Sequence, residues 1–212
     1  MIRFIVKPVH QGRRTKGAAM RAISIIKSEH KNLGAVLYSL DKLIEEIEDG
    51  KKPDFSIFHG LLTYIDRFLD RYHHPKENHY LFPKLLARAP ETESLIRELG
   101  QQHTEGEILF VEMLKALSAY EFSGDSEFPH FRETVNRYTE FERNHAHKEE
   151  EEILPKAREV LEEADWEEID AAFDENEDPI FGNKWNNEFS GLLNKLISRL
   201  PAPLGLGDDW KK

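Results

Sequence analysis

Two segments of the chain each carry a histidine that is followed four residues later by a glutamate. The first pair is His73 and Glu77, and the second is His145 and Glu149, 72 positions further along without a gap. On a helix, a separation of four residues places both side chains on one face, one turn apart. An imidazole and a carboxylate that are directed at one point form half of a metal site.

Two further histidines lie on apolar stripes of helical spacing. His30 occupies one position in a series of apolar steps of three and four from residue 20 to 49, which is typical of a helix bundle. Alone, such a histidine is more often a buried core residue than a ligand. On a third stripe, His103 is followed four residues later by Glu107. The candidate metal ligands are therefore His30, His73, Glu77, His103, Glu107, His145 and Glu149.

A bound metal explains why so many polar side chains share one inward-facing layer. Burying these groups without partners would be costly, and a cation removes that cost. The carboxylates would bridge two cations, and the imidazoles would fill the terminal positions. Nitrogen and oxygen donors without sulfur favour iron over manganese and zinc. A ferritin-like site is excluded, because it needs two Glu-x-x-His motifs and the chain has one, from Glu142 to His145.

The elements that must position these ligands are four amphipathic helices, each with one inward histidine. The histidine separations, 73 residues from His30 to His103 and 72 from His73 to His145, indicate a duplicated helical hairpin. The sequence predicts an all-α fold, an up-down four-helix bundle with additional C-terminal helices. It divides into a basic N-terminal arm (1–19), the bundle (20–160) and a C-terminal helical extension and tail (161–212), whose helices cap the bundle or form a homodimer contact.

Several residues near the second helix's ligands have their own predictions. Pro75 lies inside the helix and predicts a kink or local widening there, whereas Pro83 is expected to end it. His74 and His79 have no carboxylate four residues on, so they are expected at the surface or in a supporting position. On the fourth helix, residues 150–152 are expected to form a solvated acidic face.

Composition narrows the function classes. The 212 residues are 39% hydrophobic and 33% charged, as in a soluble helical protein, and there is no cysteine, which excludes disulfides and iron-sulfur clusters. No apolar run approaches the roughly 20 residues of a membrane helix. The first 19 residues carry five basic and no acidic side chains, but the net charge of −11 argues against nucleic acid as a partner. We expect a cytoplasmic protein without membrane contact.

The pattern resembles the hemerythrin-like HHE cation-binding family over about residues 23–157. The resemblance rests on the four inward histidines, their following glutamates and the repeated Pro83 and Pro155. It implies a four-helix bundle that holds a non-haem di-iron centre, with two iron ions per chain and a bridging oxo or hydroxo group. In the family, the bridging carboxylates correspond to Glu77 and Glu149.

The chain departs from the oxygen-carrying members of that family at two positions. They have a fifth histidine where Glu107 stands, and an aspartate where this chain has Glu150. A third carboxylate disfavours reversible oxygen carriage, so we expect a protein that binds or senses O2, NO or iron. The alternative is a di-iron redox enzyme that removes peroxide or NO or donates iron for iron-sulfur repair. A third hypothesis is an interaction module whose histidines are simply buried; the sequence leaves open whether the chain is an enzyme.

Overall fold

The computed structural model describes residues 20–174, and every long element in that range is helical. The first helix is α1 (Arg21–Glu48), and the third is α5 (Glu93–Ser123). The second consists of α2 (Phe55–Tyr64), α3 (His74–Lys76) and α4 (Phe82–Arg88), and the fourth of α6 (Phe128–Lys148) and α7 (Leu154–Val160). A further helix, α8 (Glu163–Asp174), follows, and short 3-10 turns at Pro90–Thr92 and Asp125–Glu127 lead into α5 and α6. The predicted all-α bundle is confirmed.

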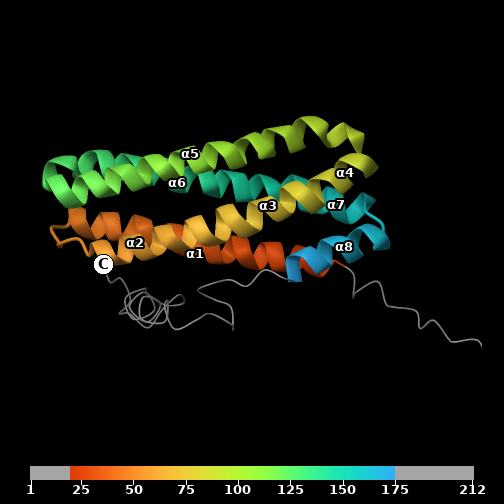
Figure 1. The fold of residues 1–212 in the computed structure, drawn as a ribbon, viewed down its shortest axis with the longest axis horizontal. Coiled ribbons are helices and arrows are strands. Elements are labelled where there is room, and N and C mark those ends of the chain that lie inside the picture. Colours follow the sequence, from red (N-terminus) through yellow and green to blue (C-terminus); the bar gives the residue numbers. More distant parts are fainter. Residues whose placement is uncertain (1–19, 175–212) are drawn as a thin grey trace, which may run out of the picture.

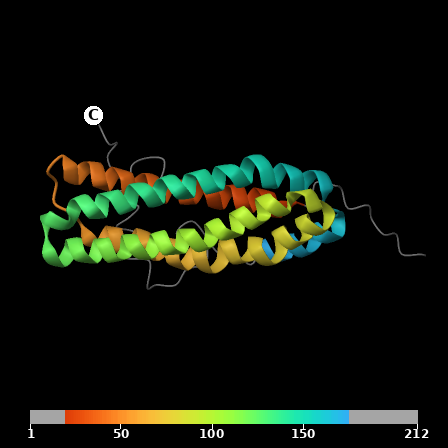
Figure 2. The ribbon, with the colours of Figure 1, turned by 90° about the horizontal axis from the view of Figure 1, so that it is seen from above.

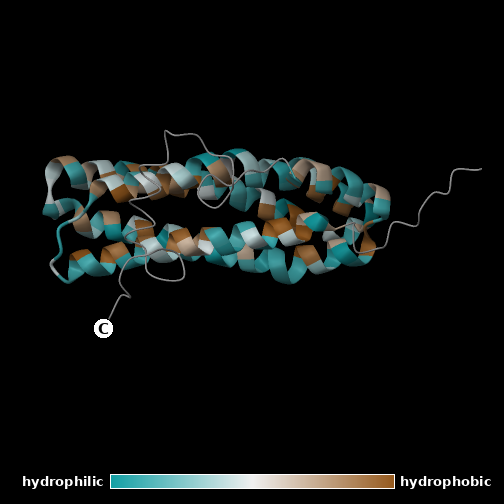
Figure 3. Cartoon of the chain, turned by 90° about the horizontal axis from the view of Figure 1, so that it is seen from below, coloured by the Kyte–Doolittle hydropathy of each residue, from teal (hydrophilic) through white to brown (hydrophobic). Residues whose placement is uncertain are grey.

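The four long helices lie side by side in two layers. In Figure 1, α1 and α2 lie below α5 and α6, and the second helix rises obliquely from α2 through α3 to α4, which lies beside the beginning of α5. Seen from above in Figure 2, α6 follows the course of α1, and α5 follows that of α2–α4. Hydrophilic residues are spread along the outside of the bundle (Figure 3). Each long helix therefore turns one face to a shared interior.

Local sequence signals fix where the helices begin and end. Asp54 caps the beginning of α2, where its side chain accepts a hydrogen bond from the backbone N–H of Ser56 at 3.1 Å. Gly50 and Gly124, with φ of 88° and 86°, follow the ends of α1 and α5. A left-handed φ costs glycine less than any other residue, so these positions end the helices cleanly.

Three π-helical stretches join the shorter helical segments. They span Ile65–His73, Glu77–Leu81 and Glu149–Ile153. The widening predicted near Pro75 is therefore confirmed, on both sides of that residue. The last two stretches are 72 positions apart, so the duplication extends to the backbone.

Pro83 does not end its helix, contrary to the sequence prediction. It lies in the first turn of α4, where its missing N–H would have no intrahelical partner. The preceding π-helical stretch changes the hydrogen-bond register there, so the chain continues as a helix to Arg88. Pro155 has the same position in α7.

Two apolar clusters fill the interior, one on each side of a polar layer. The larger one joins α1, α2, α5 and α6 through residues such as Leu37, Phe58, Met113 and Phe131. The smaller one joins α4, α7 and α8 to the beginning of α1. Six of the residues predicted from the sequence lie between the two clusters, where the apolar side chains exclude water from both directions: His30, His73, Glu77, His103, His145 and Glu149.

Helix α8 covers the beginning of α1. Trp166, Ile169 and Phe173 are fully buried in the smaller cluster. The Asp170 carboxylate accepts hydrogen bonds from the backbone N–H groups of Met20 and Ala22, at 3.1 and 2.8 Å. The prediction that a C-terminal helix caps the bundle is confirmed for α8. The predicted N-terminal arm and last helix lie outside the described residues.

Within residues 20–174, no helix combines the length and the apolar character that crossing a bilayer requires.

Candidate metal centre

Six of the seven predicted ligands meet in one buried layer of the bundle. Glu77 and Glu149 are fully buried, and none of the four histidines exposes more than 7% of its surface. The ligand atoms fall into two groups, each within a span of 4.8 Å, and both groups include the two carboxylates. One group contains His30 and His73, the other His103 and His145, and we call these the first and second histidine pairs.

Within each pair, the inward nitrogens converge. The Nε2 atoms of His30 and His73 are 3.2 Å apart, and those of His103 and His145 are 3.0 Å apart. The rings of each pair meet edge to face, with interplanar angles of 68° in both cases. Two nitrogens from different helices are thus directed at the same point.

Each carboxylate lies between the two pairs. Glu77 Oε2 is 3.5 Å from His73 Nε2 and 3.6 Å from His103 Nε2. Glu149 Oε2 is 3.3 Å from His30 Nε2, and its Oε1 is 3.5 Å from the nearest Nε2 of the second pair. Both glutamates are therefore placed to bridge two cations.

The outer nitrogen of every histidine faces an oxygen atom. The Nδ1 partners are Glu150 for His30 at 3.1 Å, Glu29 for His73 at 2.7 Å, Asn78 for His103 at 3.1 Å and Gln102 for His145 at 3.0 Å. A carboxylate or amide oxygen accepts, so each Nδ1 donates its proton outward. The Nε2 lone pairs then point inward, which is the tautomer a metal ligand needs.

The spacing of these atoms fits a metal ion. A cation about 2.1 Å from each nitrogen or oxygen, with angles of about 90° to 110° between ligands, separates neighbouring donors by about 3.0 to 3.4 Å. The nitrogen pairs and the Glu149–His30 contact fall in this range, at 3.0, 3.2 and 3.3 Å. The layer therefore needs little rearrangement to hold a metal cation.

The electrostatics of the carboxylates also favour a cation. All four carboxylate oxygens of Glu77 and Glu149 are buried, and none has a hydrogen-bond partner among the described residues. Burial and the nearby charge of Glu149 hold the pKa of the Glu77 carboxyl well above its usual value. Burial would also raise the pKa of Glu149, but the surrounding imidazoles lower it well below its usual range. Two such carboxylates are both ionised at low cost only beside positive charge.

Burial also determines the charge of His145, one member of the second histidine pair. Burial lowers the pKa of His145 from 6.5 to about 4. At neutral pH this imidazole is therefore uncharged, as a ligand must be.

Glu107, the seventh predicted ligand, does not belong to the layer. Its side chain is exposed on α5. The inward positions of α5 around the layer are Leu99, His103, Gly106 and Phe110, so the next inward residue after His103 comes three positions later rather than four. The structure therefore does not bring Glu107 into the layer with the other six predicted ligands.

The layer contains one histidine that the sequence prediction placed elsewhere. His74 is buried, at 5% exposure, and its ring stacks on that of His103 with centroids 4.0 Å apart. Its ligand atom lies within 4.8 Å of those of His103 and His145. The sequence predicted a surface or supporting position for His74, and the structure places it in the interior beside the second histidine pair. Pro75 and the widening it predicted were the available signal.

Two acidic residues outside the predicted set support the first pair. Glu29 is buried and holds His73, while Glu150 holds His30 and is about one-third exposed. The expected solvated acidic face is therefore confirmed for Glu151 and Glu152 but not for Glu150. His79 is exposed, as predicted.

A comparison with protein families supports the same assignment. No curated protein and no solved structure matches the chain in the corresponding searches. The hemerythrin HHE cation binding domain, however, matches residues 21–157, which is more than half of the chain and includes all six converging ligands. The matched family is named for cation binding, and the buried imidazoles and carboxylates of this chain are donors that suit a cation. The chain belongs to the hemerythrin HHE cation binding domain family.

Proposed function

We propose that this chain is a non-haem di-iron protein that binds or senses O2, NO or iron. One observation carries the proposal: two fully buried carboxylates without hydrogen-bond partners lie between two pairs of histidines whose Nε2 atoms converge. Two cations would neutralise the carboxylates and occupy both groups of donors at once. Nitrogen and oxygen donors without sulfur favour iron.

The proposed ligands divide between two ions. His30 and His73 would hold the first ion, and His103 and His145 would hold the second, together with His74. Glu77 and Glu149 would bridge the ions, since each belongs to both groups of donors. When bound, a pair of iron ions supplies reversible electron exchange and coordination of small ligands.

The protein's own residues fix the ligand orientation and exclude water. The four Nδ1 hydrogen bonds hold each ring in one tautomer and one orientation. The two apolar clusters close the layer along the bundle axis. Fixed imidazoles in a dry surrounding bind a metal tightly and limit side reactions with water.

The revised donor set changes the argument against reversible oxygen carriage. That argument depended on Glu107 as a third carboxylate, and Glu107 is exposed. With His74, the layer offers five imidazoles and two carboxylates. The resemblance to oxygen-carrying hemerythrins implies five histidines as well, so binding of O2 or NO is favoured.

Metal analysis of the protein, purified in air without a metal-affinity tag, tests this proposal. We expect close to two irons per chain, and spectra that change when O2 or NO is added to the reduced protein. Turnover of peroxide or NO would instead support the alternative of a di-iron redox enzyme. Zinc alone, a single metal, or no metal after anaerobic addition of Fe(II) would contradict the di-iron proposal.

A further inference from the structure

A pocket of about 380 Å³ opens between α1 and α6, beside the metal centre. Its lining includes Lys27, His30 and Gly34 from α1, and Glu142 and Ala146 from α6. His30 belongs at the same time to the first histidine pair. The pocket and the centre are therefore separated by the depth of one imidazole ring.

Gly34 leaves one wall of this pocket without a side chain. It lies in the middle of α1, one turn after His30, where glycine costs about 0.5–1 kcal/mol relative to alanine. Its φ is not in the left-handed region, and a Cβ built there would meet no atom within 4 Å. Neither a turn nor a close approach requires glycine here, and the missing side chain leaves space in the pocket that a large side chain would fill.

Glu142 forms a polar part of the opposite wall. This side chain lines the pocket although only 1% of its surface is exposed. Gly106 on α5 makes room for it, because a Cβ at that position would lie 2.8 Å from Glu142 Oε1. The missing side chain of Gly106 thus leaves room for the Glu142 carboxylate between the pocket and the bundle interior.

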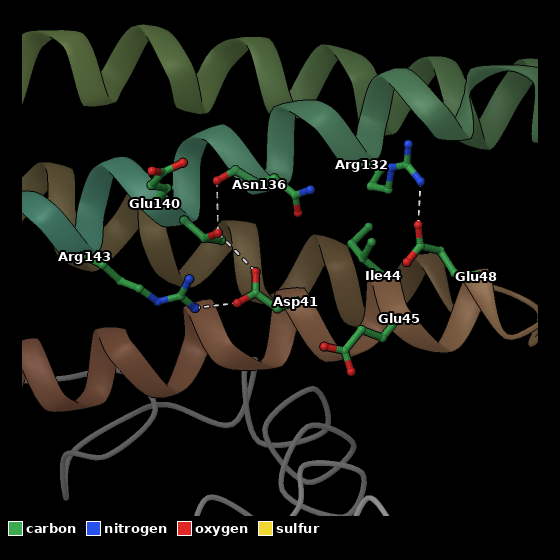
Figure 4. A pocket seen from close by; sticks show the side chains of 9 residues that line it. Asp41, Ile44, Glu45, Glu48, Arg132, Asn136, Glu140 and Arg143 are labelled. Carbon is green, nitrogen blue, oxygen red and sulfur yellow. Dashed lines mark hydrogen bonds and ion pairs between the residues drawn. The ribbon is translucent and has the colours of Figure 1, made fainter. Parts of the chain in front are cut away.

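Three basic side chains line the pocket, and two of them form ion pairs. Lys27 lies 3.7 Å from a carboxylate oxygen of Glu150. Arg143 extends to Asp41 in the next pocket along the same interface (Figure 4), which limits the groove on the side away from the centre. The third, Lys31, is exposed and has no ion-pair partner among the described residues. An exposed cationic group beside a pocket attracts small anions.

We propose that this α1–α6 pocket is the route by which small anionic ligands of the metal reach the centre. The inference rests on the proposed function, because it assumes a metal beside His30. The structure contributes the open space at Gly34, the shared His30 and the exposed cationic side chain of Lys31.

Stopped-flow binding of azide to the ferric, metal-loaded protein tests the route. Gly34→Phe should fill the pocket and slow azide association by about tenfold or more, within the one to three decades by which association rates vary among variants. Gly34→Ala is the matched control, since it also replaces the glycine and raises helix propensity without filling the space, and azide association should stay close to the unmodified rate. Metal content and the resting spectrum should be unchanged in both.

Two further variants keep the test decisive if Gly34→Phe does not fold. Ala146→Phe narrows the pocket from the α6 side and should slow azide similarly. Lys31→Glu alters an exposed residue and should slow azide association several-fold at low salt, while Lys115→Glu, an equal charge change on the exposed face of α5, should not.

If the protein takes up no metal, the proposed function fails. If it binds azide and these changes at residues 31, 34 and 146 leave the rate unaltered, the route alone is wrong.

Discussion

The ring of His74 stacks on the ring of His103, with centroids 4.0 Å apart and an interplanar angle of 16°. The two residues come from different helices, α3 and α5. Burial lowers the pKa of His74 well below 6.5, so its ring is uncharged at neutral pH and can donate a lone pair. This contact brings a fifth imidazole to the layer.

Replacing His74 by phenylalanine tests whether it is a ligand. The substitution keeps an aromatic ring against His103 but removes the donor nitrogen. We expect one of the two metals to bind about 10- to 100-fold more weakly, a range seen when groups that support a metal site are removed. Metal titration with optical detection would measure this. His79→Phe, an exposed change in the same helix, should leave both affinities unaltered, and equal affinities in the two variants would exclude His74 as a ligand.

Glu77 and Glu107 should respond oppositely to truncation. Glu77→Ala removes a carboxylate that belongs to both groups of donors, so iron content should fall from about two per chain to near zero. Glu107→Ala removes an exposed side chain, and the iron content should stay at the unmodified value. Elemental analysis of the purified variants decides the matter; loss of iron in Glu107→Ala would restore that residue to the site.

The sequence allowed the helices, the duplication and six inward ligands to be predicted, because apolar spacing and the repeat both act within one helix. The sequence did not indicate whether the third or the fourth residue after His103 faces the interior. At 100° per residue, these positions lie about 60° to one side and 40° to the other, so both share the inward face. In the structure Gly106 is the inward residue, and the Glu142 carboxylate occupies the space that a Cβ there would need.

His74 was missed for a different physical reason. In a regular α-helix, adjacent residues point about 100° apart, so His73 and His74 were not expected to serve one layer. The backbone around them is π-helical before and after a single α-helical turn, which changes the direction of successive side chains. The partners Glu29 and Glu150 were also missed, since the register between neighbouring helices is a tertiary property.

Glu77→Gln should change stability in opposite directions with and without metal. In the metal-free protein, the amide replaces a buried carboxyl without hydrogen-bond partners, so the free energy of unfolding should rise by about 1–3 kcal/mol. In the metal-loaded protein it should fall, because bound metal at 100 times its dissociation constant contributes about 2.7 kcal/mol. Urea unfolding with and without a chelator would measure both values. Glu107→Gln provides the control, and a loss of stability in metal-free Glu77→Gln would contradict the electrostatic argument.

The metal-free protein should lose stability in mild acid through His145. Burial lowers the pKa of His145 from its ordinary 6.5 to about 4 in the fold, so between these pH values the unfolded state binds a proton that the folded state does not. Stability therefore falls as pH decreases from 6.5 towards 4, by about 2 kcal/mol between pH 7 and pH 5 from this group. His145→Gln should lack this part of the decrease. Urea titrations at the two pH values check it, and equal losses in both proteins would exclude His145 as the source.

The beginning of α1 should depend on a carboxylate from the opposite end of the described chain. Met20, at the N-cap position of α1, makes no side-chain cap, and the backbone N–H groups of Met20 and Ala22 are instead bound by Asp170. Asp170→Ala should lower the free energy of unfolding by about 1–2 kcal/mol, as the loss of a helix cap does. Asp174→Ala breaks only a surface ion pair with Arg21 and should cost less than about 0.5 kcal/mol. Thermal unfolding of the two variants would measure the difference. Equal losses in Asp170→Ala and Asp174→Ala would mean that the hydrogen bonds from α1 to Asp170 add nothing beyond surface charge. Apolar contacts alone would then hold α8 against α1, the helix that carries His30.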